Sequence, residues 1–392
     1  MTPGLTLLFA VAGALAVGNL YWAQPLLAEI STALDVPLAA TGALVTGTQV
    51  GYAAGVLLLV PLGDLLNRRR LIPLVMALSA LALLACAMAP SYLVLLFSLI
   101  AVGATTVSGQ ILVPLAGDLA RDDQRGRVIG SIVSGILIGI LMSRTISGLV
   151  AEHFGWRAIY LAASTATLAL AACLARALPP DRPRQAVSYG TLLISVGYAV
   201  RGSRAVQATL AMGACMFCVF TMFWTGLTFL LSSPAFAYSV TEIGLVGLVG
   251  LAGALAARRA GRLHDRGWST RSTGAALVLA LLSVGIAAAG GTSIALVLLA
   301  VLLIDIAIQG INVLNQTRLI SIRPEARSRL NTAFVVCNFV GGAAGSMLAG
   351  LLWQTGGWTL LTAAQAIIVV LALGVWTLGR DTLKAVEVKN RG

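Results

Sequence analysis

The sequence is built from apolar blocks, each long enough to cross a lipid bilayer as a helix. A helix needs about 20 residues to span roughly 30 Å of hydrocarbon, and windows of that length define twelve blocks. The blocks fall at residues 5–29, 39–62, 71–89, 92–117, 128–151, 157–177, 206–231, 240–260, 273–291, 293–317, 330–352 and 358–378. With 58% hydrophobic and 10% charged residues, the chain has too few polar residues to cover the surface of a soluble globular protein. We therefore predict an all-α membrane protein with twelve transmembrane helices.

Basic residues lie in alternate connectors between these blocks. Of the 26 Lys and Arg residues, every one except Arg144 and Arg157 lies in an alternate connector or near the C-terminus. This asymmetry follows the positive-inside rule, so the net charge of +12 indicates membrane topology and not nucleic-acid binding. We predict a multi-pass protein of the bacterial cytoplasmic (inner) membrane with both termini in the cytoplasm.

The chain repeats itself after 202 residues. Arg125-Gly-Arg127 followed by Gly155-Trp156 returns as Arg327-Ser-Arg329 followed by Gly357-Trp358, at that single offset. The longest polar connector lies between the copies. We therefore predict an N-terminal six-helix bundle (residues 1–178), a cytoplasmic linker (179–204) and a C-terminal six-helix bundle (205–392). Residues 189–200 of the linker are expected to form a short amphipathic helix.

Small side chains recur every fourth residue in the fifth and eleventh blocks, and related stripes occur in the second and eighth. Such a stripe lets another helix approach closely inside a membrane. The stripes consist of Ser131, Gly135, Gly139, Ser143 and Ser147; Ala333, Cys337, Gly341, Gly345 and Ala349; Ala43, Gly47, Gly51 and Gly55; and Gly244, Gly247, Gly250 and Gly253. We expect these four helices to make the close contacts.

Polar residues gather in the first, fourth, seventh and tenth blocks, at spacings that place them on single helix faces. They are Asn19, Tyr21 and Gln24; Thr106 and Gln110; Thr221, Trp224 and Thr228; and Asp305, Gln309, Asn312 and Gln316. A polar stripe facing lipid would lose its hydrogen bonds, so these faces are predicted to line an internal aqueous cavity. The third, sixth, ninth and twelfth blocks are nearly uniform in Ala, Leu and Val and suit lipid contact.

This organisation, with a charged turn after the second block, resembles the major facilitator superfamily over essentially the whole chain. The family's loop signature Gly-x-Leu-Ala-Asp-Arg-x-Gly-Arg-Arg is similar to residues 60–69, VPLGDLLNRR. Leu62, Asp64, Arg68 and Arg69 match, whereas Val60, Leu65 and Asn67 depart from it. A degenerate second copy, residues 261–267, contains Asp265.

The resemblance implies that substrate binds between the two halves and that rocking exposes it to each side of the membrane in turn. It further implies that Asp64, with Arg68 and Arg69, forms a conformational latch. In that latch Asp64 would meet the positive N-terminal end of the eleventh helix. The alternative is that the arginines serve only to fix topology.

The subfamily is less clearly marked. The first block, with NLYWAQPLL at residues 19–27, resembles bacterial drug:proton antiporter-type efflux permeases. Their Gly-Pro-x-x-Gly-Gly signature in the fifth span is replaced here by Ser143-Arg144-Thr-Ile-Ser147-Gly148, and residues 93–109 contain no arginine. The resemblance implies export driven by a proton gradient, with no other cofactor.

Arg144 and Asp305 are charged residues deep inside apolar blocks, where charge is unfavourable unless paired or hydrated. Three interpretations are open. Asp305 could exchange protons, with Arg144 tuning it; Arg144 could bind an anionic part of the substrate; or the two could form a structural ion pair.

The remaining motifs favour structural roles. Cys215 and Cys218 form a C-x-x-C pair inside a membrane helix, where a redox role is not expected. Glu242, three residues after Ser239, fits a capping box, and Asp118 is expected to pair with Arg121 or Arg125.

No catalytic residues, metal site or enzymatic activity are predicted from the motifs, and no nucleic-acid partner is expected. We predict a monomeric secondary transporter, in contact with membrane lipid, that exports small, largely apolar organic compounds or drugs by proton-coupled alternating access. The alternatives are uptake or facilitated transport of a small organic acid, and a non-transporting membrane sensor.

Overall fold

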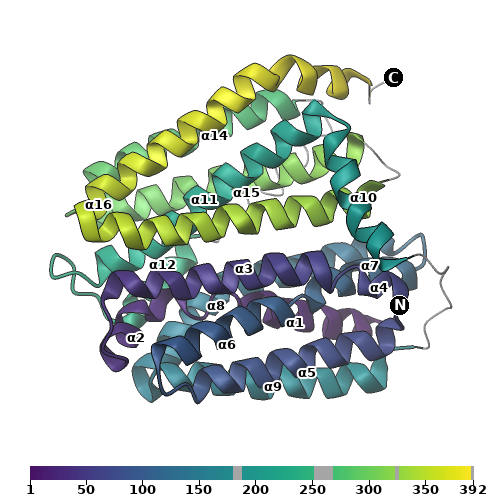
Figure 1. The fold of residues 1–392 in the computed structure, drawn as a ribbon, viewed down its shortest axis with the longest axis horizontal. Helices are drawn as coiled ribbons and strands as arrows, with labels where there is room; N and C mark the ends of the chain where they lie inside the picture. The colour runs from purple at the N-terminus through teal and green to yellow at the C-terminus, as the bar shows by residue number, and fades with distance from the viewer. Residues whose placement is uncertain (180–187, 251–267, 323–325, 390–392) are drawn as a thin grey trace. The chain divides into compact units, whose positions relative to one another are not determined.

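The computed structural model describes residues 1–179, 188–250, 268–322 and 326–389, and every regular element among them is a helix (Figure 1). Nine of these helices are long and apolar enough to cross a membrane. The chain divides into two compact units, which are described separately. Unit 1 comprises residues 1–193 and 239–247, and unit 2 comprises residues 194–238 and 248–392. The predicted domain limits at 178 and 205 stay predictions.

Unit 1 contains most of the helices of the first half. They are α1 (Pro3–Gly18), η1 (Gln24–Leu26), α2 (Leu27–Ala33), η2 (Leu38–Thr41), α3 (Gly42–Leu58), α4 (Leu62–Leu65), α5 (Arg68–Ala87), α6 (Tyr92–Thr105), α7 (Ser108–Leu119), α8 (Arg125–Phe154), α9 (Trp156–Ala177) and α12 (Val240–Val246). Two predicted spans are interrupted, the first after Gly18 and the fourth at Thr106. Pro25 lies in the first break, where its missing N–H interrupts helical hydrogen bonding.

Unit 2 contains α11 (Arg204–Leu231), α14 (Ser269–Ala289), α15 (Ile294–Ile322) and α16 (Arg327–Lys389). Helix α10 (Tyr189–Arg201), which confirms the helix predicted in the linker, and η3 (Gly247–Gly250) cross the boundaries between the units. The second copy of the loop signature, residues 261–267, and Gly253 of the eighth-block stripe lie outside the described residues.

The sequence repeat is visible in the backbone. Helices α8 and α9 meet at Gly155, with φ 78°, and α16 consists of two helices that meet at Gly357, with φ 57°. Residues other than glycine are strained at these angles. Trp156 and Trp358 follow directly, so both copies turn between two helices in the same way.

The glycine stripes pack against helices of their own unit. A Cβ atom on Gly139 would meet the backbone of Ala14 in α1, and one on Gly341 would meet the backbone of Ala214 in α11. In the second block, Gly55 faces the backbone of α6 in the same manner. The predicted close approach is therefore confirmed at these positions.

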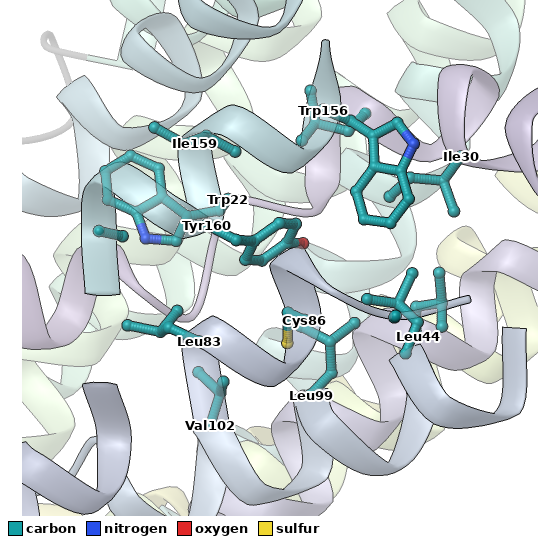
Figure 2. Close-up of a cluster of buried hydrophobic side chains, with 14 of the residues drawn as sticks. Trp22, Ile30, Leu44, Leu83, Cys86, Leu99, Val102, Trp156, Ile159 and Tyr160 are labelled. Carbon is teal, nitrogen blue, oxygen red and sulfur yellow. The ribbon is translucent and has the colours of Figure 1, made fainter. Parts of the chain in front are cut away.

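A cluster of buried apolar side chains holds α5, α6 and α9 of unit 1 together (Figure 2). Tyr160 lies among Leu83, Cys86 and Ile159, and Trp156 packs edge-on against it with ring centroids 6.0 Å apart. The opposite faces of these helices stay apolar and exposed, with Leu74, Leu78 and Leu81 on α5 and Leu161 and Leu168 on α9. This division suits helices that pack inward and meet lipid outward.

Candidate functional site

Arg144 is buried in unit 1 against the break in the first span. Its side chain projects from α8 and is 2% exposed. The Nε group donates to Oε1 of Gln24 at 2.8 Å, and the guanidinium carbon lies 4.9 Å from the centre of the Tyr21 ring. Amide oxygens and aromatic faces both stabilise a buried guanidinium. The structure thus brings together three residues predicted for the site.

Helix α12 covers the same part of α8. A Cβ atom on Gly247 would lie 3.2 Å from the Arg144 Cβ, and Gly244 packs against the Arg144 carbonyl. The Thr145 hydroxyl donates to the Gly244 carbonyl at 3.0 Å. Glu152 accepts the Thr241 backbone N–H at 2.9 Å. The small residues predicted at the start of the eighth block therefore let α12 lie directly on α8.

Asn19 and Thr106 connect the two interrupted spans of unit 1. Asn19 Oδ1 accepts the Trp22 indole N–H at 2.8 Å, and its Nδ2 donates to the Thr106 hydroxyl at 3.4 Å. Thr106 in turn donates to the Ala16 carbonyl at 2.8 Å. These bonds satisfy backbone and side-chain groups at the breaks, and a role as substrate ligands stays a prediction. Gln110 lies on α7 and donates to the Tyr52 hydroxyl at 3.1 Å.

Asp305 is a buried charged residue of unit 2. It lies on α15, is 3% exposed, and accepts the indole N–H of Trp224 on α11 at 3.3 Å. Aromatic rings continue from Trp224, with Phe220 at 6.4 Å and Phe217 at 5.6 Å from Phe220. The carboxyl group therefore lies at one end of a row of aromatic side chains.

The other predicted residues of unit 2 differ in their surroundings. The hydroxyls of Thr221 and Thr228 donate to the carbonyls of Gly342 and Trp224, at 2.7 and 3.2 Å. Asn312 Oδ1 accepts from Asn338 at 3.3 Å. Gln309 is partly buried, and the exposed Gln316 donates to Asn331 at 2.9 Å.

Arg318 is a buried residue whose place in the sequence identified it only as one of the basic residues that set the membrane topology. It is 3% exposed and donates to Asn315, Ser269 and Thr273 at 3.0, 3.0 and 2.9 Å. Asn315 lies one turn away on α15. This spacing of three residues was the only feature of the sequence that could have predicted a buried partner for Arg318. Its partners on α14 are about fifty residues distant, so the contact depends on tertiary packing.

The charged turn after α3 is organised around Arg68, whose side chain is 7% exposed. It donates to Asp118 at 2.9 Å, to Asp64 at 3.2 Å and to the Gly63 carbonyl at 2.8 Å. Arg69 is exposed, and its backbone N–H is capped by Asn67. The proposed contact of Asp64 with the eleventh span stays a prediction.

The expected pairing of Asp118 was wrong. Arg121 pairs with Asp123 and Arg125 with Asp122, because those carboxylates share the short turn with them. Asp118 lies at the end of α7 and meets Arg68 from the start of α5.

One smaller prediction is confirmed. Ser239 and Glu242 form the predicted capping box at the start of α12. The five cysteines are free thiols, and the described part of the chain contains no group of three residues suited to a metal ion.

Comparison with known proteins identifies the fold and the class of function. Residues 9–324 match the Major Facilitator Superfamily. The chain is 40% identical over 379 residues to the "Uncharacterized transporter YgaY" of Escherichia coli O157:H7, covering 97% of this chain and 96% of the relative. It is 33% identical over 371 residues to the "Probable transporter SCO4007" of Streptomyces coelicolor, covering 94% and 85%.

Solved structures agree on the fold. A bacterial homolog of the human lysosomal transporter Spinster has a TM-score of 0.77 at 14% identity, with 97% of this chain and 98% of that chain covered. The nucleoside transporter NupG has a TM-score of 0.76 at 15% identity, with 95% and 99% covered. The chain therefore belongs to the major facilitator superfamily, and it is a membrane transporter and not an enzyme.

Proposed function

We propose that this transporter exports small, largely apolar organic compounds in exchange for protons, by alternating access. The observation that carries the proposal is the Asp305 carboxyl group, buried on α15 beside the Trp224 indole. A carboxyl group that is wetted in one state and dry in another is suited to binding and releasing a proton. No metal or organic cofactor is required, because the proton gradient supplies the driving force.

The aromatic residues next to Asp305 support an apolar substrate. Phe217, Phe220, Trp224 and Phe339 follow one another with ring centroids 4.9 to 6.4 Å apart. Aromatic surfaces with a few polar groups are typical of small-molecule sites. The proposed cavity also includes the polar residues predicted on the first, fourth, seventh and tenth spans.

Arg144 supports a second candidate, the uptake or facilitated transport of a small organic acid. The guanidinium is held by Gln24 and Tyr21, and it could bind a carboxylate of the substrate. In the export proposal Arg144 instead tunes proton binding at Asp305. The two candidates differ in the charge of the transported compound.

The same proposal places both termini in the cytoplasm of a bacterial inner membrane, because Lys and Arg occupy alternate connectors. The protein acts as a monomer. The Asp64, Arg68 and Arg69 turn acts as a latch on the cytoplasmic side.

The test begins with a panel of drugs, sugars and organic acids, scored for altered resistance or accumulation in cells with and without the protein. Compounds that respond are then measured in proteoliposomes containing wild type or Asp305→Asn. We expect Asp305→Asn to abolish accumulation driven by a proton gradient while exchange of labelled for unlabelled substrate continues. Gradient-driven transport that survives intact in Asp305→Asn would exclude Asp305 as the proton site. Responses confined to organic acids, lost in Arg144→Gln, would favour the second candidate.

A further inference from the structure

Gln49 on α3 is a buried amide that the site described above does not use. Its side chain is 0% exposed, and neither its Oε1 nor its Nε2 atom has a hydrogen-bond partner in the described part of the chain. A buried amide without hydrogen bonds is strongly unfavourable. A ligand that donates to Oε1 and accepts from Nε2 would remove this unfavourable free energy.

The position of Gln49 on α3 shows what surrounds it. Gly51 and Gly55 pack against the backbone of α6, and helical geometry turns Gln49 to the opposite face of α3. Tyr52 shares that face, three residues further along. The Tyr52 hydroxyl accepts a hydrogen bond from Gln110 of α7 at 3.1 Å. The Gln49 amide therefore shares its helix face with the Tyr52 hydroxyl, which is itself hydrogen-bonded to a second helix.

The face also carries Thr46, three residues before Gln49, whose hydroxyl donates to the Gly42 carbonyl at 3.2 Å, and its other residues are apolar. Val45 and Val56, four residues before and seven after Gln49, are both 1% exposed. An apolar face with two neighbouring uncharged polar groups suits a compound that is itself mostly apolar and carries a single polar function.

We propose that Gln49 is a specificity-determining residue that binds a neutral carboxamide or lactam group of the transported compound. A carboxamide has one acceptor and adjacent donors, so the Gln49 amide can accept the ligand N–H and donate to the ligand carbonyl together. Binding would satisfy both atoms of the side chain and would select against compounds that lack the donor. This inference rests on the proposed transport of apolar compounds, and it adds the chemical class that is recognised.

Gln365 provides a matched comparison within the same protein. It is also 0% exposed, and its two amide atoms have no hydrogen-bond partner in the described residues. It lies on the face of α16 that carries Leu361 and Trp358, which contact Gly226 of α11 and the Ala287 carbonyl of α14. Since that face packs between two helices of its own unit, Gln365 is assigned no ligand.

The experiment measures ligand-induced thermal stabilisation of the purified full-length protein in detergent. The probes are 2-naphthamide and 2-acetonaphthone, which have the same shape and differ in an NH2 group replaced by a methyl group. We expect 2-naphthamide to raise the Tm of wild type more than 2-acetonaphthone does. The preference should disappear in Gln49→Leu and persist in Gln365→Leu.

Several results would overturn the inference: no stabilisation of wild type by 2-naphthamide up to its solubility limit, equal stabilisation by both probes, or an unchanged preference in Gln49→Leu. Gln49→Asn keeps the amide on a shorter arm and is expected to show a reduced preference, which separates ligand recognition from a folding defect. The measurement uses no proton gradient. If the preference for 2-naphthamide is absent but proton-driven export is intact, only the role of Gln49 is refuted. If wild type prefers 2-naphthamide but shows no proton-driven export, only the proposed function is refuted.

Discussion

The two units share their helix packing but not their buried charges. In unit 1, α8 packs on α1 with Gly139 against Ala14, and in unit 2, α16 packs on α11 with Gly341 against Ala214. These matched contacts give the two halves a common scaffold.

Gln24 lies in the break of the first span, whereas Trp224 lies within the continuous helix α11. Gln24 holds Arg144 from α8, whereas Trp224 holds Asp305 from α15. The two units thus bury charges of opposite sign, which come from different helices. Under the proposed function, the duplicated scaffold serves folding and the unrepeated charges serve transport.

The largest expected effect tests the shared packing. Gly139→Leu and Gly341→Leu would each drive a side chain into the backbone of the facing helix. Overpacking of this kind typically costs about 1–3 kcal/mol, and more when backbone must move. We expect both variants to lose most of their folded, monodisperse protein in size-exclusion chromatography after mild heating.

The controls for that experiment come from the same helices. Gly130 of α8 and Gly374 of α16 have no atoms within 4 Å of an added Cβ, so Gly130→Leu and Gly374→Leu should behave as wild type. Tolerance of leucine at either Gly139 or Gly341 would show that the packing is not equivalent in the two units.

Features of the scaffold could be predicted from the sequence because they depend on local patterns. Apolar length placed the helices, and glycine spacing identified the faces that approach closely. The bonds of Arg68 to Asp118 and of Arg318 to Thr273 join residues about fifty positions apart. Helical spacing predicts only contacts between neighbouring turns, so it could not predict these bonds. The sequence also could not predict that Gln49 lacks a hydrogen-bond partner in the described residues. The position of a polar residue on a helix face does not show whether a partner from another helix will reach it.

The second prediction concerns the charge of unit 1. Arg144→Lys keeps the positive charge, but an ammonium cannot match the planar guanidinium that donates to Gln24 and lies over Tyr21. We expect transport to fall at least about tenfold, which corresponds to about 1.4 kcal/mol, with little change in folding.

Ser346 occupies the position equivalent to Arg144, five residues after Gly341, and donates to the Gly342 carbonyl at 3.1 Å. The same hydroxyl also donates to the Ala343 carbonyl at 3.2 Å. Ser346→Ala should therefore leave transport within about twofold of wild type, since it removes neutral hydrogen bonds and no charge. Equal losses in Arg144→Lys and Ser346→Ala would contradict the assignment of transport to the unrepeated residues.

A smaller effect is expected at Trp224 of unit 2. Trp224→Phe keeps an aromatic ring but removes the N–H that bonds to Asp305. The bond is weak, because its donor and acceptor are 3.3 Å apart. The pH dependence of transport should nevertheless shift because the carboxylate loses that donor. Proteoliposome uptake measured across pH would detect the shift.

Trp358→Phe provides the control, because the indole of Trp358 donates to the Ala287 carbonyl at 2.7 Å and not to Asp305. That variant should lower thermal stability and leave the pH profile of transport in place. An identical profile for Trp224→Phe and wild type would mean that the indole does not influence proton binding.

The smallest effect is expected from the two buried arginines that stabilise helix ends, Arg68 in unit 1 and Arg318 in unit 2. The carboxylate of Asp118 is 61% exposed, so its pair with Arg68 is screened by solvent and worth at most about 1 kcal/mol. Asp118→Asn should therefore lower the Tm slightly at low salt and not at about 1 M salt, where the Debye length is about 3 Å.

Thr273→Val removes an uncharged partner of Arg318, so its decrease in Tm should be the same at both salt concentrations. If the change in Tm depends on salt equally in both variants, both helix ends are stabilised by the same kind of interaction. The difference between the buried charges of the two units would then be limited to Arg144 and Asp305.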